Sequence, residues 1–271
     1  MSKPRLLDVK GESGLPDITH VFLLVDLFIA GSVFGSFAAA LGERSTRGES
    51  VIRPRSHCTN CGKPLAAFEL IPIWSWLLLK GRCRRCHIRI PIHYPIAEST
   101  LGTVAVLLCW QSSSWLAALV SSLLWFTLVV AMSTDVIVLM VPNWLTYSNA
   151  IVVYVLMSLL ERNFVKPLFF MLVGFGIPLL VYFLSRGRMG LGDAKLYASI
   201  GAVLGPWLTI ESFVFSSIFG AVIGLFLRCT GQFHKKQLIP FVPFIVMGVG
   251  SAEFLANGLP QWYIHTLLHL G

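Results

Sequence analysis

The sequence predicts an all-α polytopic membrane protein with about eight transmembrane helices and one small polar loop domain. The chain is 55% hydrophobic and only 13% charged. Several apolar stretches approach the roughly 20 residues that an α-helix needs to cross a bilayer. Soluble helices carry a polar face, and that face is missing across most of the sequence, except in residues 42 to 95. These observations exclude an ordinary soluble globular protein.

The expected spans follow one another with short connections. We divide the chain into an N-terminal segment with the first transmembrane helix (1–41), a polar loop domain (42–95), a transmembrane core (96–256) and a C-terminal tail (257–271). The predicted spans are residues 20–41, 96–112, 115–133, 143–161, 167–185, 195–209, 211–228 and 238–256.

The first span is expected to be retained and not cleaved as a signal peptide. Its apolar stretch begins only near Val21, after a mixed-charge leader, and no clear small-residue cleavage pattern follows it. Basic residues then set the orientation, because cytoplasmic loops carry the excess of Lys and Arg. Ten of the 21 Lys and Arg residues lie between Arg44 and Arg89. This loop is therefore predicted to be cytoplasmic, and the N-terminus to lie outside the cytoplasm.

Two aspartates stand at the edges of apolar segments. Asp135 follows the apolar run from Leu116 to Met132, and Asp193 lies in the sequence Gly190-Leu191-Gly192-Asp193. An ionisable side chain at membrane depth is costly and often functional. Counting spans from the basic loop places both aspartates on the cytoplasmic side. Two such carboxylates are what a membrane aspartyl protease needs, whereas a single aspartate at the end of a span is more often a solvated helix cap than a catalyst.

Four cysteines in the polar loop have the spacing of a metal site. Cys58 and Cys61 form one pair, Cys83 and Cys86 form a second, and two residues separate the partners of each pair. Four thiolates give closed tetrahedral coordination, so we predict structural zinc. A cytoplasmic location keeps thiols reduced and favours metal over disulfides. The alternative ligands are the adjoining residues His57 and His87, while Cys109 and Cys229 are expected to be inert thiols of the apolar segments.

The basic residues of this loop do not require a nucleic acid. Topology selection and attraction to anionic lipid account for them, and no aromatic or RNA-binding motif accompanies them. We therefore expect membrane lipid, and no nucleic acid, as a partner.

The motifs, taken together and in order, resemble those of the type IV prepilin peptidase family over about residues 35–248. The matching segments are Gly35-Ser36-Phe37 with Arg44; Pro54-Arg55-Ser56-His57-Cys58 with Cys61; Ile71-Pro72; Lys80-Gly81-Arg82-Cys83 with Cys86; Tyr94-Pro95 with Glu98; Asp135 with Pro142-Asn143; Gly190 to Lys195; and Pro240-Phe241 with Pro243-Phe244.

The resemblance implies an aspartyl endopeptidase of the bacterial inner membrane. Asp135 and Asp193 would form the catalytic pair, supported by Gly190, Gly192 and Lys195. The substrates implied are precursors of type IV pilins or type II secretion pseudopilins, cut on the cytoplasmic side. Such enzymes commonly also methylate the new N-terminus with S-adenosylmethionine.

Two positions depart from the family pattern. Ala39 replaces the usual Asn, and Thr59 replaces the usual Pro after the first Cys. These departures bear on methylation more than on cleavage, because both aspartates and the Gly-x-Gly-Asp context are present.

Two other functions remain open from the sequence. In a proton- or cation-coupled transporter, the two aspartates with Glu98 and Asp26 would form an ion path, but such a protein is expected to have mid-span acids and internal repeats, and neither is clear. A presenilin-like intramembrane protease shares the Gly-x-Gly-Asp signature but lacks the four-cysteine loop. For Glu98 itself, the sequence leaves two structural roles: orienting the loop on the membrane, or pairing with an arginine.

Overall fold

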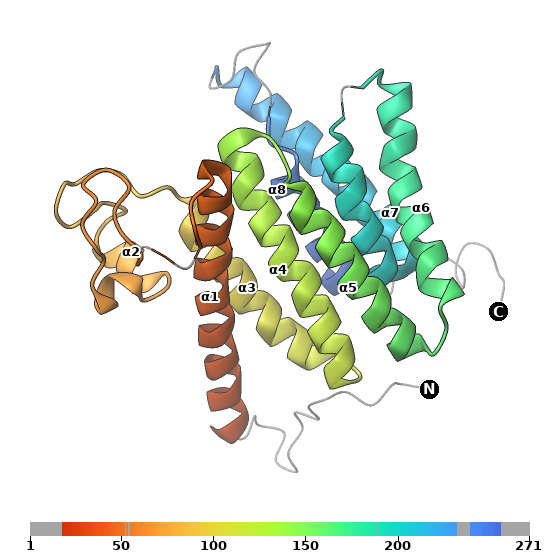
Figure 1. Ribbon diagram of the computed structural model, residues 1–271, viewed down its shortest axis with the longest axis horizontal. Coiled ribbons are helices and arrows are strands. Elements are labelled where there is room, and N and C mark those ends of the chain that lie inside the picture. Colours follow the sequence, from red (N-terminus) through yellow and green to blue (C-terminus); the bar gives the residue numbers. More distant parts are fainter. Residues whose placement is uncertain (1–17, 52, 54, 188, 232–238, 256–271) are drawn as a thin grey trace. The chain divides into compact units, whose positions relative to one another are not determined.

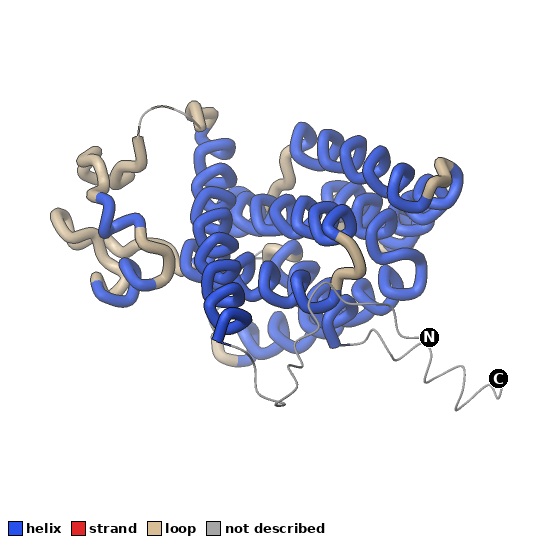
Figure 2. Tube along the Cα trace, turned by 90° about the horizontal axis from the view of Figure 1, so that it is seen from below, coloured by secondary structure: helices blue, strands red, loops and turns tan. Residues whose placement is uncertain are grey.

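The described part of the chain is helical. The computed structural model describes residues 18–51, 53, 55–187, 189–231 and 239–255. Within these ranges the chain forms helices and loops, and the β-structure is limited to two isolated bridges (Figure 1 and Figure 2). The all-α prediction is therefore confirmed. The chain divides into two compact units, Met1–Ile137 and Val138–Gly271, and each is described by itself.

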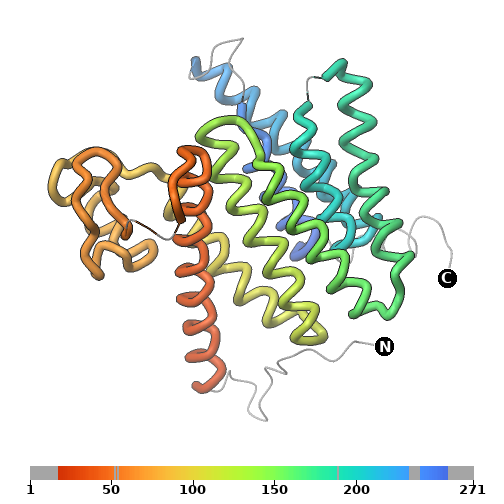
Figure 3. The backbone as a smooth tube through the Cα atoms, viewed as in Figure 1, coloured from red at the N-terminus to blue at the C-terminus, as the bar shows by residue number. Residues whose placement is uncertain are grey.

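The first unit holds the polar loop between two packed helices. Helix α1 (Ile18–Arg47) leads into the loop, which contains the short helices η1 (Ala67–Leu70) and α2 (Trp74–Leu78), and the chain returns through α3 (His93–Gln111), as Figure 3 shows. Small residues let α1 and α3 approach closely. A Cβ atom on Gly35 would lie 2.5 Å from the Ala97 carbonyl oxygen.

Helix α4 (Trp115–Val138) completes the first unit. Residues 127–135, in its C-terminal half, are all buried, and the last three residues of the helix are exposed. On one side it contacts α1, where the Phe37 and Phe126 rings stack at a centroid distance of 6.1 Å. Gly42 of α1 also packs against Ser133, and a Cβ atom on that glycine would lie 2.7 Å from the Ser133 Cβ atom. This close packing positions the C-terminal end of α4, where Asp135 lies.

The second unit is built around one long helix. Helix α7 (Leu191–Cys229) packs against α5 (Asn143–Glu161), α6 (Val165–Leu184) and α8 (Val242–Gly250), and α8 continues into the π-helix η2 (Ser251–Leu255). Gly174 of α6 and Gly201 of α7 face each other with their Cα atoms 3.0 Å from the position of the partner's Cβ. The buried Tyr197 hydroxyl lies 3.0 Å from Ser216 Oγ within α7.

Within the described residues each predicted span falls on a helix, but the count of eight transmembrane helices is not confirmed. Residues 238 and 256 of the last predicted span and the C-terminal tail 257–271 lie outside the described residues. Five of the described helices (α1, α4, α5, α6 and α7) are long and apolar enough to cross a membrane. The break predicted between the spans 195–209 and 211–228 lies earlier in the chain, because α7 is helical at residue 210 and is interrupted at Gly205. The helix kinks at Gly205, whose φ of 75° favours glycine, and Pro206 removes a backbone donor there.

The glycine contact between α6 and α7 predicts a difference between two neighbouring substitutions. Gly174→Ala should destabilise the protein by about 1–3 kcal/mol, because the new methyl group meets the Tyr197 carbonyl. Gly176→Ala is the matched control, since nothing lies within 4 Å of its Cβ position. Thermal unfolding in detergent measures both, and equal unfolding temperatures for the two variants would contradict this packing.

Candidate metal site and buried carboxylates

The two cysteine pairs are held by matching turns. The Cys58 N–H donates to the Lys63 carbonyl (3.0 Å) and the Gly62 N–H donates back to the Cys58 carbonyl (2.9 Å). Cys83 forms the equivalent bonds with Ile88 (2.9 Å) and His87 (3.0 Å). The bridges His57↔Pro64 and Arg82↔Arg89 close the two turns in the same register. Each turn therefore presents both of its thiols on one side.

The four thiols meet at one point. The Sγ atoms of Cys58, Cys61, Cys83 and Cys86 all lie within 4.8 Å of one another, and the Cys58 and Cys86 sulfurs are 3.7 Å apart. In a tetrahedron with metal–sulfur bonds of about 2.3 Å, the sulfurs are about 3.8 Å apart. The cluster thus fits a metal ion held by four cysteines. No histidine belongs to this cluster among the described residues, so the alternative ligands His57 and His87 are not needed.

The surroundings of Cys86 favour the thiolate that a metal requires. A hydrogen bond from the Ile88 backbone, aided by the Asn60 side chain, lowers the pKa of Cys86 to about 6. A thiolate is the metal-binding form of cysteine. At neutral pH this side chain is therefore prepared for coordination.

The residue after each cysteine pair adopts a left-handed backbone. Gly62 has a φ of 67° and His87 has a φ of 58°. Glycine adopts this conformation freely, whereas a residue with a Cβ atom does so at a cost of about 1–2 kcal/mol. The second turn thus contains strain that the first does not.

A buried glutamate connects the loop to the membrane helices. Glu98 of α3 accepts a hydrogen bond from the Ile73 N–H (2.6 Å) and another from the Ser36 side chain of α1. Ile73 has φ 63° and ψ −55°, and the Trp74 N–H bonds back to the Pro72 carbonyl at 2.6 Å. This is a γ-turn of the rare, strained kind, and its centre is a β-branched residue. Of the two roles left open for Glu98, the structure favours orienting the loop.

A second glutamate ties α1 to α3. The buried Glu43 accepts hydrogen bonds from the Tyr94 hydroxyl and from Arg47, the latter at 2.5 Å. Sequence reasoning did not find this cluster, because Glu43 and Tyr94 are 51 residues apart. The only signal was the presence of Tyr94 in a family motif.

Asp135 lies within the last turns of α4, in the first unit, and is only 7% exposed. The neighbouring hydroxyls are satisfied by their own helix: Ser133 donates to the Val129 carbonyl (2.9 Å) and Thr134 to that of Ala131 (2.9 Å). Helix α4 continues to Val138, past the end of the predicted span 115–133. Asp135 therefore lies on the helix and is buried within the first unit.

Asp193 occupies the first turn of α7, in the second unit, and is equally buried. A helix N-terminus favours a negative charge at this position. Neither of the adjacent glycines Gly190 and Gly192 has a positive φ. They are needed for space: a Cβ atom on Gly190 would lie 3.2 Å from Asp193 Oδ2, and one on Gly192 would lie 3.1 Å from the Val141 Cβ.

Lys195, near the start of α7, contacts two residues of α5. Its Nζ donates to Asn143 Oδ1 (2.7 Å) and lies 4.8 Å from the centre of the Tyr147 ring. Both partners belong to α5. These contacts fix the start of α7 against the start of α5, and with it the position of Asp193.

The fold and these sites define a helical membrane protein that combines a four-cysteine loop with buried aspartates. Comparison with known families assigns it more closely. Residues 29–112 match the Bacterial Peptidase A24 N-terminal domain, and residues 121–225 match the Type IV leader peptidase family. The chain belongs to the type IV leader peptidase family.

Curated relatives agree with this assignment. Proteins named "Prepilin leader peptidase/N-methyltransferase" from Bacillus subtilis (strain 168) and Myxococcus xanthus (strain DK1622) are 31% and 32% identical to this chain. The alignments cover 91% of this chain and 100% of the first relative, and 92% of this chain and 78% of the second. A relative of the same name from Aeromonas salmonicida (strain A449) is 32% identical over 79% of this chain and 76% of its own length. No solved structure matches the chain.

The two cysteine turns predict opposite effects for a matched pair of substitutions. His87→Gly removes backbone strain and should keep the metal while making it harder to extract, by the equivalent of about 1 kcal/mol. Gly62→Ala should weaken retention by a similar amount, since its new methyl group meets no atom within 4 Å and only backbone strain is added. Chelator competition with metal analysis measures both variants. Loss of metal from His87→Gly would instead make His87 a ligand.

Proposed function

We propose that this protein is an aspartyl endopeptidase that removes the leader peptides of type IV prepilins or type II secretion pseudopilins at the cytoplasmic face of the inner membrane. Family membership supports a leader peptidase, and several apolar helices fit a multi-pass membrane enzyme. The observation that carries the aspartyl assignment is the burial of Asp135 and Asp193, each 7% exposed at the end of an apolar helix. An ionisable side chain at the end of an apolar membrane helix is a candidate functional group.

In the proposed mechanism the two carboxylates act as a pair on one water molecule. Like charges a few ångströms apart disfavour double ionisation, so one aspartate keeps a proton. The ionised partner accepts a proton from water as the oxygen attacks the scissile carbonyl. The protonated partner donates to the carbonyl oxygen as the tetrahedral intermediate forms. No covalent intermediate with the enzyme is needed.

The supporting residues Gly190, Gly192 and Lys195 hold Asp193 in position. Gly190 leaves room beside the Asp193 carboxylate, and Gly192 allows Val141 to approach the start of α7. Lys195 holds the starts of α5 and α7 together through Asn143. Each contact limits the freedom of Asp193, and a fixed catalytic group costs less reorganisation during reaction.

The metal in this proposal is zinc, with a structural role. Four protein ligands close the coordination sphere and leave no position for substrate or water. Zinc would join the two cysteine turns and stabilise a loop that has little apolar core of its own. We propose in addition that the enzyme methylates the new N-terminus with S-adenosylmethionine, because the names of the relatives include an N-methyltransferase activity for those proteins.

The dyad predicts that Asp135→Asn and Asp193→Asn each abolish leader removal, because a neutral amide cannot serve as the base. Cleavage of a prepilin by purified enzyme in liposomes, read by product mass, measures this directly. Asp26→Asn is the matched control: Asp26 lies on an exposed part of α1 and its variant should cleave at the wild-type rate. Full activity in either of the other two variants would overturn the dyad.

Methylation is tested in the same reaction by adding S-adenosylmethionine. The proposal expects the mature product to gain the mass of one methyl group. Cleaved product without that mass, at saturating donor, would show that the peptidase alone is retained. Ala39→Asn, which restores the usual family residue, then tests whether this departure is the cause.

A further inference from the structure

The short helix α2 has two different sides. Trp74, Leu77 and Leu78 lie at positions i, i+3 and i+4, which share one face of a helix, and they are 66%, 54% and 77% exposed. Ser75 and Trp76 line a cavity on the other side together with residues of α1. Exposed Phe68, Leu70 and Ile71 precede the helix. We call these six exposed apolar residues the α2 face.

Such a face is unexpected on a polar loop. Contiguous exposed apolar surface usually marks a binding site for a protein or a membrane. The loop needs no such surface for its own stability, since the cysteine turns and the Glu98 hydrogen bond hold it on other sides.

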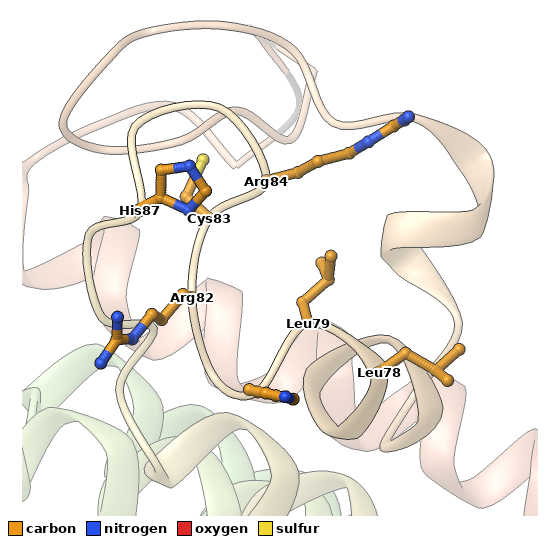
Figure 4. Close-up of a pocket in the computed structure, with 7 residues that line it drawn as sticks. Leu78, Leu79, Arg82, Cys83, Arg84 and His87 are labelled. Carbon is orange, nitrogen blue, oxygen red and sulfur yellow. The ribbon is translucent and has the colours of Figure 1, made fainter.

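The α2 face is bordered by cations. Lys80, Arg82 and Arg84 line a cavity of about 500 Å³ together with Leu78 and Leu79. Figure 4 shows Arg82, Arg84 and the two leucines around it. The Arg84 guanidinium carbon also lies 5.1 Å from the centre of the Phe68 ring. Apolar side chains next to Lys and Arg are the pattern of segments that lie in the headgroup region of anionic bilayers.

The position of α2 along α1 agrees with a place in the headgroup region of the membrane. The cavity behind α2 is lined on α1 by residues from Val33 to Arg47, so it extends from the apolar segment of that helix to its charged C-terminal end. Val33 lies eight residues before Leu41, the last residue of the predicted first span, which corresponds to about 12 Å along the helix. Interfacial helices are buried about 5–10 Å into the boundary between headgroups and acyl chains. Helix α2 therefore lies beside a spanning helix at the level of the membrane surface.

We propose that the α2 face inserts into the cytoplasmic membrane surface and that Lys80, Arg82 and Arg84 bind the phosphates of anionic lipid headgroups. The rival occupant is a substrate peptide. Lipid is favoured because α2 lies beside a spanning helix, and because the three cations would repel a basic leader peptide. The contact between the α2 face and the lipid determines how far the loop lies from the membrane. The hydrogen bond between Ile73 and Glu98 then fixes the loop in that position relative to α3.

The test is amide hydrogen exchange of the full chain in nanodiscs. The amides of residues 74–79 should exchange severalfold more slowly in discs that contain phosphatidylglycerol than in discs of phosphatidylcholine alone. Lys80→Gln/Arg82→Gln should reduce the lipid preference by roughly fivefold for each charge removed. Arg53→Gln/Arg55→Gln removes the same charge from exposed positions elsewhere in the loop and is the matched control.

Leu77→Ser/Leu78→Ser tests the apolar part independently and should remove the protection in both lipids. Unchanged metal content in every variant shows that the loop is folded. Exchange that does not depend on lipid charge, or that slows only when a prepilin is added, would overturn the proposal, and the latter result would assign the surface to substrate. This inference does not depend on catalysis, so it can fail or succeed independently of the aspartyl dyad.

Discussion

The cost of burying carboxylates among apolar helices governs this structure. Glu43 and Glu98 are buried in the first unit, and each is stabilised by donors from another element: Tyr94 of α3 for Glu43, and Ile73 of the loop for Glu98. An unpaired buried charge would cost several kcal/mol. The two glutamates thereby join α1, α3 and the loop, which the weak packing of a small polar loop would not achieve alone.

The polar loop uses one part for the metal site and another part for its attachment to the helices. Its cysteines gather at one point, which fits a closed metal site, while its γ-turn at Ile73 binds the membrane helices. The strain at Ile73 is tolerated because the Glu98 carboxylate holds the amide in place. Helix α2 begins at this turn, so the same contact determines which side of α2 faces the cavity lined by α1 and which side is exposed.

The sequence predicts helices and the metal cluster well because both depend on local spacing. The predicted span 143–161 coincides with α5, and the cysteine spacing identifies the four clustered thiols. The break expected between the predicted spans 195–209 and 211–228 lies at Gly205 instead, because the positive φ of this glycine and the neighbouring Pro206 interrupt the helix before the apolar pattern changes. The Glu43–Tyr94 hydrogen bond and the strained Ile73 turn depend on tertiary contacts, which no local pattern contains. The pairing of Asp135 with Asp193 stays a prediction.

The central claim is that these two aspartates form one catalytic unit, and a double-mutant cycle tests it most directly. Groups that act as a unit show strongly non-additive losses. The measurement is kcat/KM for leader cleavage by the wild type, both single Asn variants and the double variant. The account predicts that the double variant is no slower than either single variant. Losses that add across the two positions would show that the carboxylates act independently and would contradict the dyad.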